Sequence, residues 1–306
     1  MSKDEKALTI DAVNKSGYPF QRRIAHEIAS SGWRVDFEYD TRFFADMYGE
    51  ERTKIDILAT AGVHYPTTPE VMSVVECKRR EPAYHKWLFF SRKGDLLTKQ
   101  ELMPMAPVVW CKPGPVGQDG IIYSHSALVQ PERFDRTNNT ATRYDCYLEL
   151  KAKAGKGKQR TSATEIEDAF KTSATEIEDA FRQVAVGLRG VMRDLYLDRV
   201  SGTGKRRDQV PSRTVLLPVV VSSAPISSCS FADAGVDLKR GILDVDSTKL
   251  ANQRWLLCSY VLPYELRFSD RPESSELCIW VVGAENCREF FRLVREDASQ
   301  WNEDKH

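Results

Sequence analysis

The sequence predicts an α/β fold in which helices flank a mixed β-sheet. Short apolar runs typical of buried strands alternate along the chain with segments in which apolar residues recur at helical spacing. The 306 residues, of which 42% are hydrophobic, are enough to bury a large core. We therefore expect a single elaborated domain over residues 1–306.

The first elements expected are a helix followed by three strands. The helix begins near Pro19, carries apolar residues at helical spacing and ends near Gly32. Apolar and polar residues then alternate over residues 33–39, and strand-like apolar runs follow at residues 54–58 and 71–77. This order predicts a helix, three strands and a core that starts at about residue 17.

The rest of the chain divides into three further parts. Residues 81–160 are mixed in character and are expected to be an insertion, and residues 161–225 return to the core with a helix and a strand. Residues 226–306 form a C-terminal strand and helix extension. In these last two parts, strands are expected at residues 214–221, 255–262 and 277–282, and a closing helix at residues 285–295.

An internal duplication lies at the start of the second core helix. Residues 161–171 are repeated as residues 172–182, and only the last residue of each copy differs. Eleven residues make about three helical turns with a drift of about 20°, so a helix can absorb the repeat by lengthening. We expect this lengthened helix. The alternative is a shorter helix with the first copy displaced, because both copies carry a capping box that can start a helix.

Composition excludes several classes of protein. The 44 basic and 44 acidic residues cancel, so any surface for nucleic acid must be a local patch. The seven cysteines contain no Cys-x-x-Cys pair, which argues against a zinc knuckle. The chain shows no signal peptide, no apolar run long enough to span a membrane and no phosphate-binding loop. We expect a cytoplasmic protein that does not interact with membranes.

The most informative residues are acids embedded in the apolar runs. A carboxylate costs several kcal/mol to desolvate without a partner, so Asp56 and Glu76 call for a cation, a hydrogen-bond network or an open cleft. Strand periodicity places Glu76 and Lys78 on one face of a strand, and Asp56 on the face opposite Ile55 and Ile57. If the two strands are neighbours, the two acids and Lys78 converge and form a candidate metal site.

These residues resemble a known pattern. Asp56 followed by Glu76-Cys77-Lys78 resembles the PD-(D/E)XK, or restriction-endonuclease-like, nuclease superfamily, and the helix bearing Glu27 resembles that of its Mrr and Holliday-junction-resolvase branch. The resemblance implies a restriction-endonuclease-like core of helix, three strands, helix and strand. An Ile stands at the nominal Pro position before Asp56, which is a common variation in that superfamily.

The resemblance also implies a chemistry. Asp56, Glu76 and the backbone carbonyl of Cys77 would hold Mg²⁺, or Mn²⁺ in its place, and Glu27 would supply a further acid. Magnesium takes hard oxygen ligands and keeps waters that can act as nucleophiles. Lys78 would orient or deprotonate the attacking water. The implied activity is hydrolysis of phosphodiester bonds in nucleic acid, with DNA favoured over RNA, and a homodimer would supply one site per strand of a duplex.

Each residue also has an ordinary structural explanation. Asp56 could form an ion pair at a strand end, Lys78 could be a surface lysine, and Glu27 could lie on the solvated face of its helix. Arg79 and Arg80, which continue the positive run, could contact phosphates. At the level of the whole protein, one alternative is an inactive nucleic-acid-binding or assembly module with the same fold. The other is an unrelated α/β protein in which the acids lie far apart.

Overall fold

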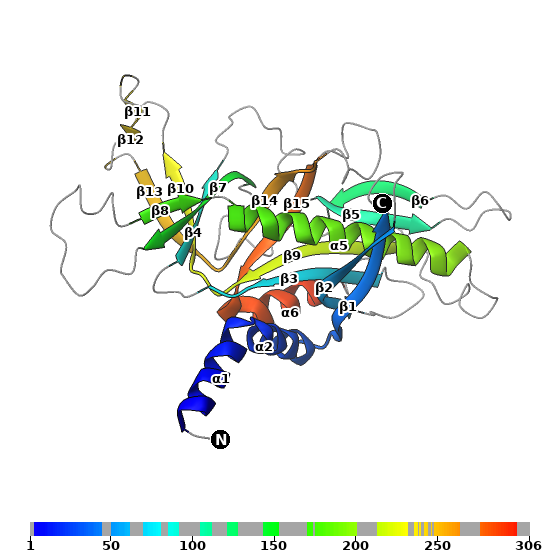
Figure 1. Ribbon diagram of the computed structural model, residues 1–306. Coiled ribbons are helices and arrows are strands. Elements are labelled where there is room, and N and C mark those ends of the chain that lie inside the picture. The colour runs from blue at the N-terminus through cyan, green and yellow to red at the C-terminus, as the bar shows by residue number, and fades with distance from the viewer. Residues whose placement is uncertain are drawn as a thin grey trace.

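The computed structural model describes residues 3–44, 50–61, 70–80, 85–91, 105–111, 121–127, 143–152, 170–173, 175–200, 213–231, 236–237, 239, 242–243, 246, 248–263 and 276–298. Within these residues, thirteen strands form one mixed sheet (Figure 1). The expected α/β fold with a mixed sheet is therefore confirmed.

The main path through the sheet runs in the order β1-β2-β3-β9-β15-β14-β7-β4-β10-β13. These strands are β1 (Arg34–Phe44), β2 (Glu50–Ala61), β3 (Glu70–Lys78), β9 (Arg213–Ser222), β15 (Glu276–Gly283), β14 (Trp255–Val261), β7 (Arg143–Ala152), β4 (His85–Ser91), β10 (Ile226–Phe231) and β13 (Thr248–Gln253). Off this path, β5 (Met105–Cys111) pairs with β9 and with β6 (Ile121–Ala127), and β8 (Phe170–Ser173) pairs with β7. A separate small pair is formed by β11 (Val236–Asp237) and β12 (Ile242–Leu243).

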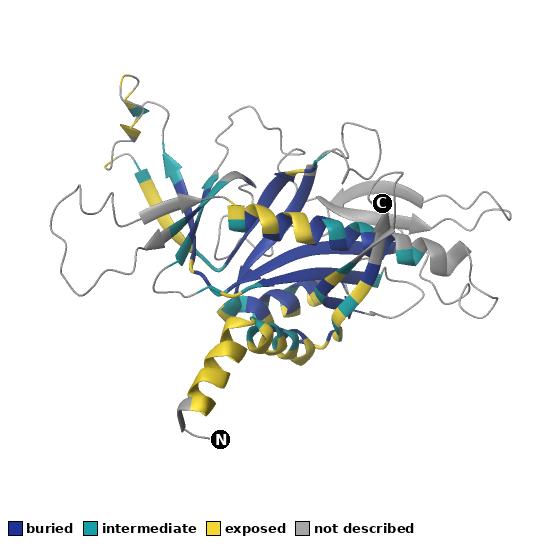
Figure 2. Ribbon diagram, viewed as in Figure 1, coloured by how far each residue is buried: buried dark blue, intermediate teal, exposed yellow. Residues whose placement is uncertain are grey.

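Helices cover both faces of the sheet (Figure 1). The long helix α5 (Thr175–Val200) lies on one face, over β1, β2, β3 and β9. The opposite face is covered by α2 (Tyr18–Ser30) and α6 (Cys287–Ala298), the latter preceded by the short helix η6 (Ala284–Asn286). The N-terminal helix α1 (Lys3–Lys15) extends away from this body, and Figure 2 shows it as almost wholly exposed.

The buried side chains form one hydrophobic cluster on each face of the sheet. The cluster under α5 contains Ile177 and Phe181 of that helix, both 0% exposed. The cluster on the other face contains Ile24 and Ile28 of α2 together with aromatic residues of α6. The central strands between them are buried on both sides (Figure 2), which explains their continuous apolar runs.

The first part of the chain folds as the sequence predicts. Helix α2 starts with Pro19 in its first turn and ends before Gly32, whose φ of +88° is the left-handed conformation that favours glycine. The three strands that follow pair in sequence order, and β3 then pairs in parallel with β9. The helix and strands expected near the C-terminus are also present as α6, β14 and β15.

The strands of residues 81–160 continue the main sheet. Strand β4 pairs antiparallel with β7, and these two lie between β14 and β10 of the C-terminal extension. Trp87 and Phe89 of β4 are both 0% exposed in the cluster under α5, so these aromatic residues belong to the core.

The duplication does not lengthen the helix, so that prediction is wrong. Helix α5 begins at Thr175, inside the second copy. The junction of the two copies, Phe170–Ser173, forms β8 instead, and its pairing with β7 takes these residues out of the helix. The shorter-helix alternative is the one observed, whereas residues 161–169 of the first copy lie outside the described part.

Among the described helices, none has an apolar stretch of sufficient length to cross a bilayer.

Candidate functional site

The pairing of β2 with β3 brings the two acids together. Ile57 pairs with Val75, and the next position along each strand places Asp56 opposite Glu76. The charge of Asp56 acts directly on the ionisation of Glu76. The wide separation that a chance occurrence of the motif predicts is therefore not seen.

Two donors hold the carboxylate of Asp56. The side-chain amide of Gln21, on α2, donates to Oδ1 at 2.8 Å, and the backbone N–H of Cys77 donates to Oδ2 at 2.8 Å. Burial raises the pKa of Asp56, and this effect is opposed by the Cys77 N–H, by the charge of Lys78 and by Gln21. Asp56 thus has a fixed orientation beside the backbone of β3.

Asp56 sits at an interruption in the strand alternation. Ile55 packs in the cluster under α5, whereas Ile57 packs in the cluster on the opposite face, so the expectation that these two share a face is wrong. On the neighbouring strand β1, Glu38 has a φ of 50°, and the pairing passes from Phe37–Ile57 to Tyr39–Ile55 around it. This local distortion explains how the Asp56 carboxylate reaches Cys77 and Gln21.

Glu76 and Lys78 lie on the α5 side of β3 and form an ion pair. Oε1 of Glu76 lies 2.9 Å from Nζ of Lys78, with the two side chains 11% and 16% exposed. Nζ of Lys78 also donates to Oε1 of Gln183, on α5, in a close contact. The pKa of Glu76 is raised to about 7, first by burial and then by the charge of Asp56, against the lowering effect of Lys78. The buried carboxylates of Asp56 and Glu76 thus repel each other, and a bound cation would reduce this repulsion.

Cys77 points to the face of β3 opposite Glu76 and Lys78, as the alternation of a strand requires. It packs with the α2 and α6 side chains. Burial raises its thiol pKa well above the usual range, and the charges of Asp56 and Glu76 add to this effect. The thiol is therefore a poor nucleophile and a packing group.

The structure does not group Glu27 with the acid pair. Its carboxylate lies between two arginines, 2.5 Å from Nη2 of Arg23 and 2.7 Å from Nε of Arg288. It lines a pocket of about 420 Å³ between α2 and the start of α6. The side chain is only 13% exposed, so it is not on a solvated face either. Within the described ranges, no group of three or more His, Cys, Asp and Glu side chains is arranged to hold a metal ion.

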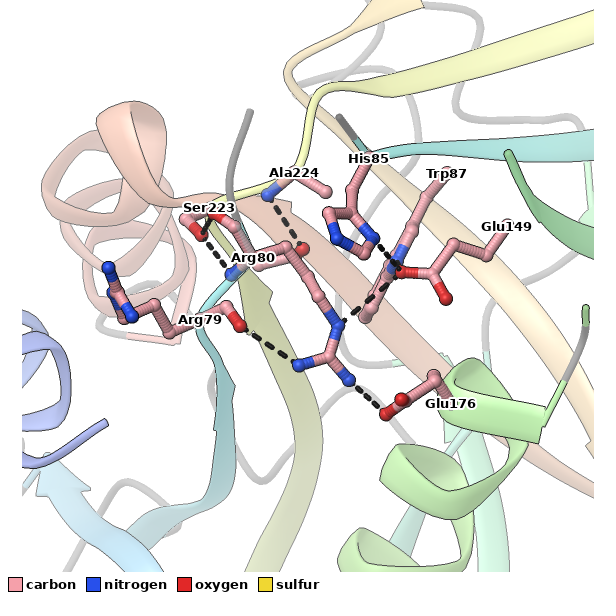
Figure 3. Close-up of polar contacts among 9 residues, drawn as sticks. Arg79, Arg80, His85, Trp87, Glu149, Glu176, Ser223 and Ala224 are labelled. Carbon is pink, nitrogen blue, oxygen red and sulfur yellow. Dashed lines mark hydrogen bonds and ion pairs between the residues drawn. The ribbon is translucent and has the colours of Figure 1, made fainter. Parts of the chain in front are cut away.

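The two arginines after Lys78 have different environments. Arg79 is exposed, and Figure 3 shows its side chain directed away from the guanidinium of Arg80. Arg80 contacts Glu176 at the start of α5 through Nη2, and its Nε lies 3.4 Å from Oε1 of Glu149, on β7 (Figure 3). Glu149 is 0% exposed and its Oε1 also lies 3.0 Å from Nδ1 of His85. The guanidinium of Arg80 is therefore paired with Glu149 and Glu176 and does not form part of an exposed phosphate-binding patch.

The backbone after β3 is also tied to the next core strand. The N–H of Arg80 donates to Oγ of Ser223 at 2.6 Å, and that hydroxyl donates to the carbonyl of Arg80 at 2.6 Å. The N–H of Ser223 donates to the carbonyl of Lys78 at 3.1 Å. These bonds extend the pairing of β3 with β9 past the Glu76 and Lys78 positions and hold this end of the strand in place.

Sequence reasoning missed Gln21 and Gln183. Gln21 lies on α2, 35 positions along the sequence from its partner Asp56. Gln183 lies on α5, 105 positions from its partner Lys78. Gln183 is exposed and Gln21 is partly exposed, so the apolar spacing that reveals a helix says nothing about them. No sequence pattern singles them out.

Comparison of the chain with protein-family models, with curated proteins and with known three-dimensional structures finds no match.

The donor set suits magnesium. Mg²⁺ is usually held by one or two carboxylates, with waters and substrate phosphates completing its shell. Asp56 and Glu76 provide two carboxylates, and both have a pKa raised by burial. A divalent cation would neutralise this pair and remove their repulsion, so the residues present fit the ion.

Proposed function

We propose that the protein is a metal-dependent nuclease that hydrolyses phosphodiester bonds of nucleic acid, with DNA as the favoured substrate. The observation that carries this proposal is the meeting of Asp56 and Glu76 on paired strands, with the ammonium of Lys78 at 2.9 Å from Glu76. Lysine and two acids in this arrangement are the functional groups that the resemblance to PD-(D/E)XK nucleases implies.

The arrangement of the elements supports the same proposal. Helix α2, strands β1 to β3, helix α5 and strand β9 follow one another in the order expected for a restriction-endonuclease-like core, interrupted by the strands of residues 81–160. Strands β1, β2, β3 and β9 are also neighbours in the sheet. The proposed site lies where β2 and β3 separate, with α2 on one side and α5 on the other.

In the proposed mechanism, Asp56, Glu76 and the backbone carbonyl of Cys77 would hold Mg²⁺, which when bound supplies an activated water and offsets charge on the phosphate. Gln21 and the Cys77 N–H fix the orientation of the Asp56 carboxylate. The Nζ of Lys78 would donate a hydrogen bond to the attacking water or to a phosphate oxygen that gains negative charge. Because Nζ is already held between two acceptors, little reorganisation is needed to present it.

The test is a cleavage assay on supercoiled, linear and branched DNA, with Mg²⁺ or with EDTA. We expect the wild type to cleave only with Mg²⁺ and Asp56→Ala to be inactive with either. DNA binding that persists without any cleavage would instead favour the inactive binding module. A protein that neither binds nor cleaves any of these substrates, or an Asp56→Ala variant as active as the wild type, would refute the nuclease proposal.

A further inference from the structure

Lys78 has two acceptors, and only one of them belongs to the proposed metal site. Nζ lies 2.9 Å from Oε1 of Glu76 and also contacts Oε1 of Gln183, on α5. If Glu76 coordinates a cation, its oxygens are no longer fully available to the ammonium. Gln183 then remains as the acceptor that keeps Lys78 at the site.

The chemistry of Gln183 suits this role. Its amide oxygen can accept a hydrogen bond from the ammonium of Lys78. Gln183 is an exposed residue. Its contact with Lys78 is therefore not a by-product of burial in the core.

Close packing fixes the position of α5 relative to the site. Gly187 lies one turn after Gln183, and a Cβ added there would be 2.8 Å from Cγ1 of Ile55 and 3.1 Å from Cγ1 of Val74. At Gly190 an added Cβ would be 2.4 Å from Cγ2 of Thr41. The backbone of α5 thus lies directly on β1, β2 and β3, because these positions lack side chains.

A polar contact fixes the same helix at its start. Arg80 lies two residues after Lys78, and its guanidinium contacts Glu176, two turns before Gln183 (Figure 3). Two cations at the end of β3 therefore each reach an acceptor on α5, at two points along the helix axis. The glycine packing and this contact together hold Gln183 within reach of Lys78.

We infer that Gln183 is a positioning residue that holds the Lys78 ammonium in place when Glu76 is engaged with the metal ion. This inference rests on the proposed nuclease function. Gln183 touches neither the proposed metal nor the substrate and acts only through Lys78.

The experiment compares Gln183→Met, which keeps the length of the side chain but removes the acceptor, with Gln183→Glu, which keeps an acceptor. The matched control is Arg182→Met, at the neighbouring exposed position on α5. For each protein, the single-turnover rate of DNA cleavage with Mg²⁺ and the Kd for uncleaved DNA in Ca²⁺ are measured separately. We expect the cleavage rate of Gln183→Met to fall roughly tenfold, because the loss of one hydrogen bond to a charged group raises the activation barrier by about 1.4 kcal/mol. The Kd for DNA should change little. Gln183→Glu should retain most of the rate, and Arg182→Met should match the wild type.

A second measurement reports on Lys78 itself. Acetylation of its amine by acetic anhydride in Mg²⁺, followed by mass spectrometry, should be several-fold faster in Gln183→Met than in the wild type and in Arg182→Met. A Gln183→Met protein with wild-type cleavage and wild-type acetylation would overturn the positioning role while leaving the nuclease proposal intact. Equal losses in Gln183→Met and Gln183→Glu would also overturn it, because the acceptor would then not be what matters. A folded wild type that cleaves no DNA would instead overturn the nuclease proposal, and this inference with it.

Discussion

Glu76 should make the free energy of unfolding of the protein depend on pH. The side chain is 11% exposed, and burial together with the charge of Asp56 raises its pKa from 4.5 to about 7. One pH unit corresponds to about 1.4 kcal/mol of differential stabilisation, so this displacement corresponds to about 3 kcal/mol. In the unfolded chain Glu76 loses its proton near pH 4.5, whereas in the folded protein it keeps the proton until about pH 7.

The direction of the effect follows from proton binding. Between these two pH values the folded state binds more protons than the unfolded state, so the contribution of Glu76 to the free energy of unfolding falls as pH rises. The contribution is complete below about pH 4.5 and is lost as pH rises through about 7. Replacing Glu76 by Gln removes the buried charge and should remove this part of the pH dependence.

The assay is urea unfolding in EDTA at several pH values from 5 to 8, for the wild type and Glu76→Gln. We expect the stability of the wild type relative to the variant to fall by about 2 to 3 kcal/mol over this range. Glu285→Gln, in the separate pocket near Glu27, is the control and should run parallel to the wild type. Parallel curves for Glu76→Gln and the wild type would show that Glu76 does not have a raised pKa in the folded protein.

Two further predictions concern the surroundings of the site. Arg80→Met removes a cation from the fully buried Glu149, so the free energy of unfolding measured in urea should fall by about 3 to 5 kcal/mol, and Glu149→Leu in the same chain should recover much of the loss. A loss below about 1 kcal/mol from Arg80→Met would contradict this role. Deleting residues 161–171 removes Phe170 and Lys171 from the short strand β8 but keeps the second copy, which supplies Ile177 and Phe181, both 0% exposed. The deletion should therefore cost less than about 1 kcal/mol in the same measurement. A cost above about 2 kcal/mol would show that the first copy contributes to the core.

The fold near the site could be predicted because its signals are local. Apolar spacing between Pro19 and Gly32 marks α2, and apolar runs mark β2 and β3. If β2 and β3 are neighbours, antiparallel pairing can bring Asp56 beside Glu76, and the structure has this pairing. The strands follow from short-range patterns, whereas their adjacency and register come from the structure.

The remaining features depend on contacts that no local pattern encodes. The period of a strand predicts one face for Ile55 and Ile57, but the distortion at Asp56 and Glu38 separates them. Helical phase permits a long helix through both copies of the duplication, but the pairing of Phe170–Ser173 with β7 competes with it. In both cases tertiary contacts outweigh the local preference.

The same limit applies to the side chains around the motif. Glu27 was expected to join the acids, but Arg288, which lies 261 positions later in the chain, pairs with it instead. The roles of Gln21 and Gln183 likewise depend on how α2 and α5 are placed on the sheet. These distances are set by packing, so only the three-dimensional structure reveals them.

The most direct test of the proposed function is whether Asp56 and Glu76 form one cation site. Titration of the protein with Mn²⁺, followed by electron paramagnetic resonance at pH 8, measures this without any substrate. We predict one Mn²⁺ bound per chain in the wild type, with affinity lowered at least tenfold in both Asp56→Asn and Glu76→Gln and unchanged in Glu285→Gln. Binding that is absent from the wild type, or that is equally strong when either acid is replaced, would contradict a cation site formed by Asp56 and Glu76.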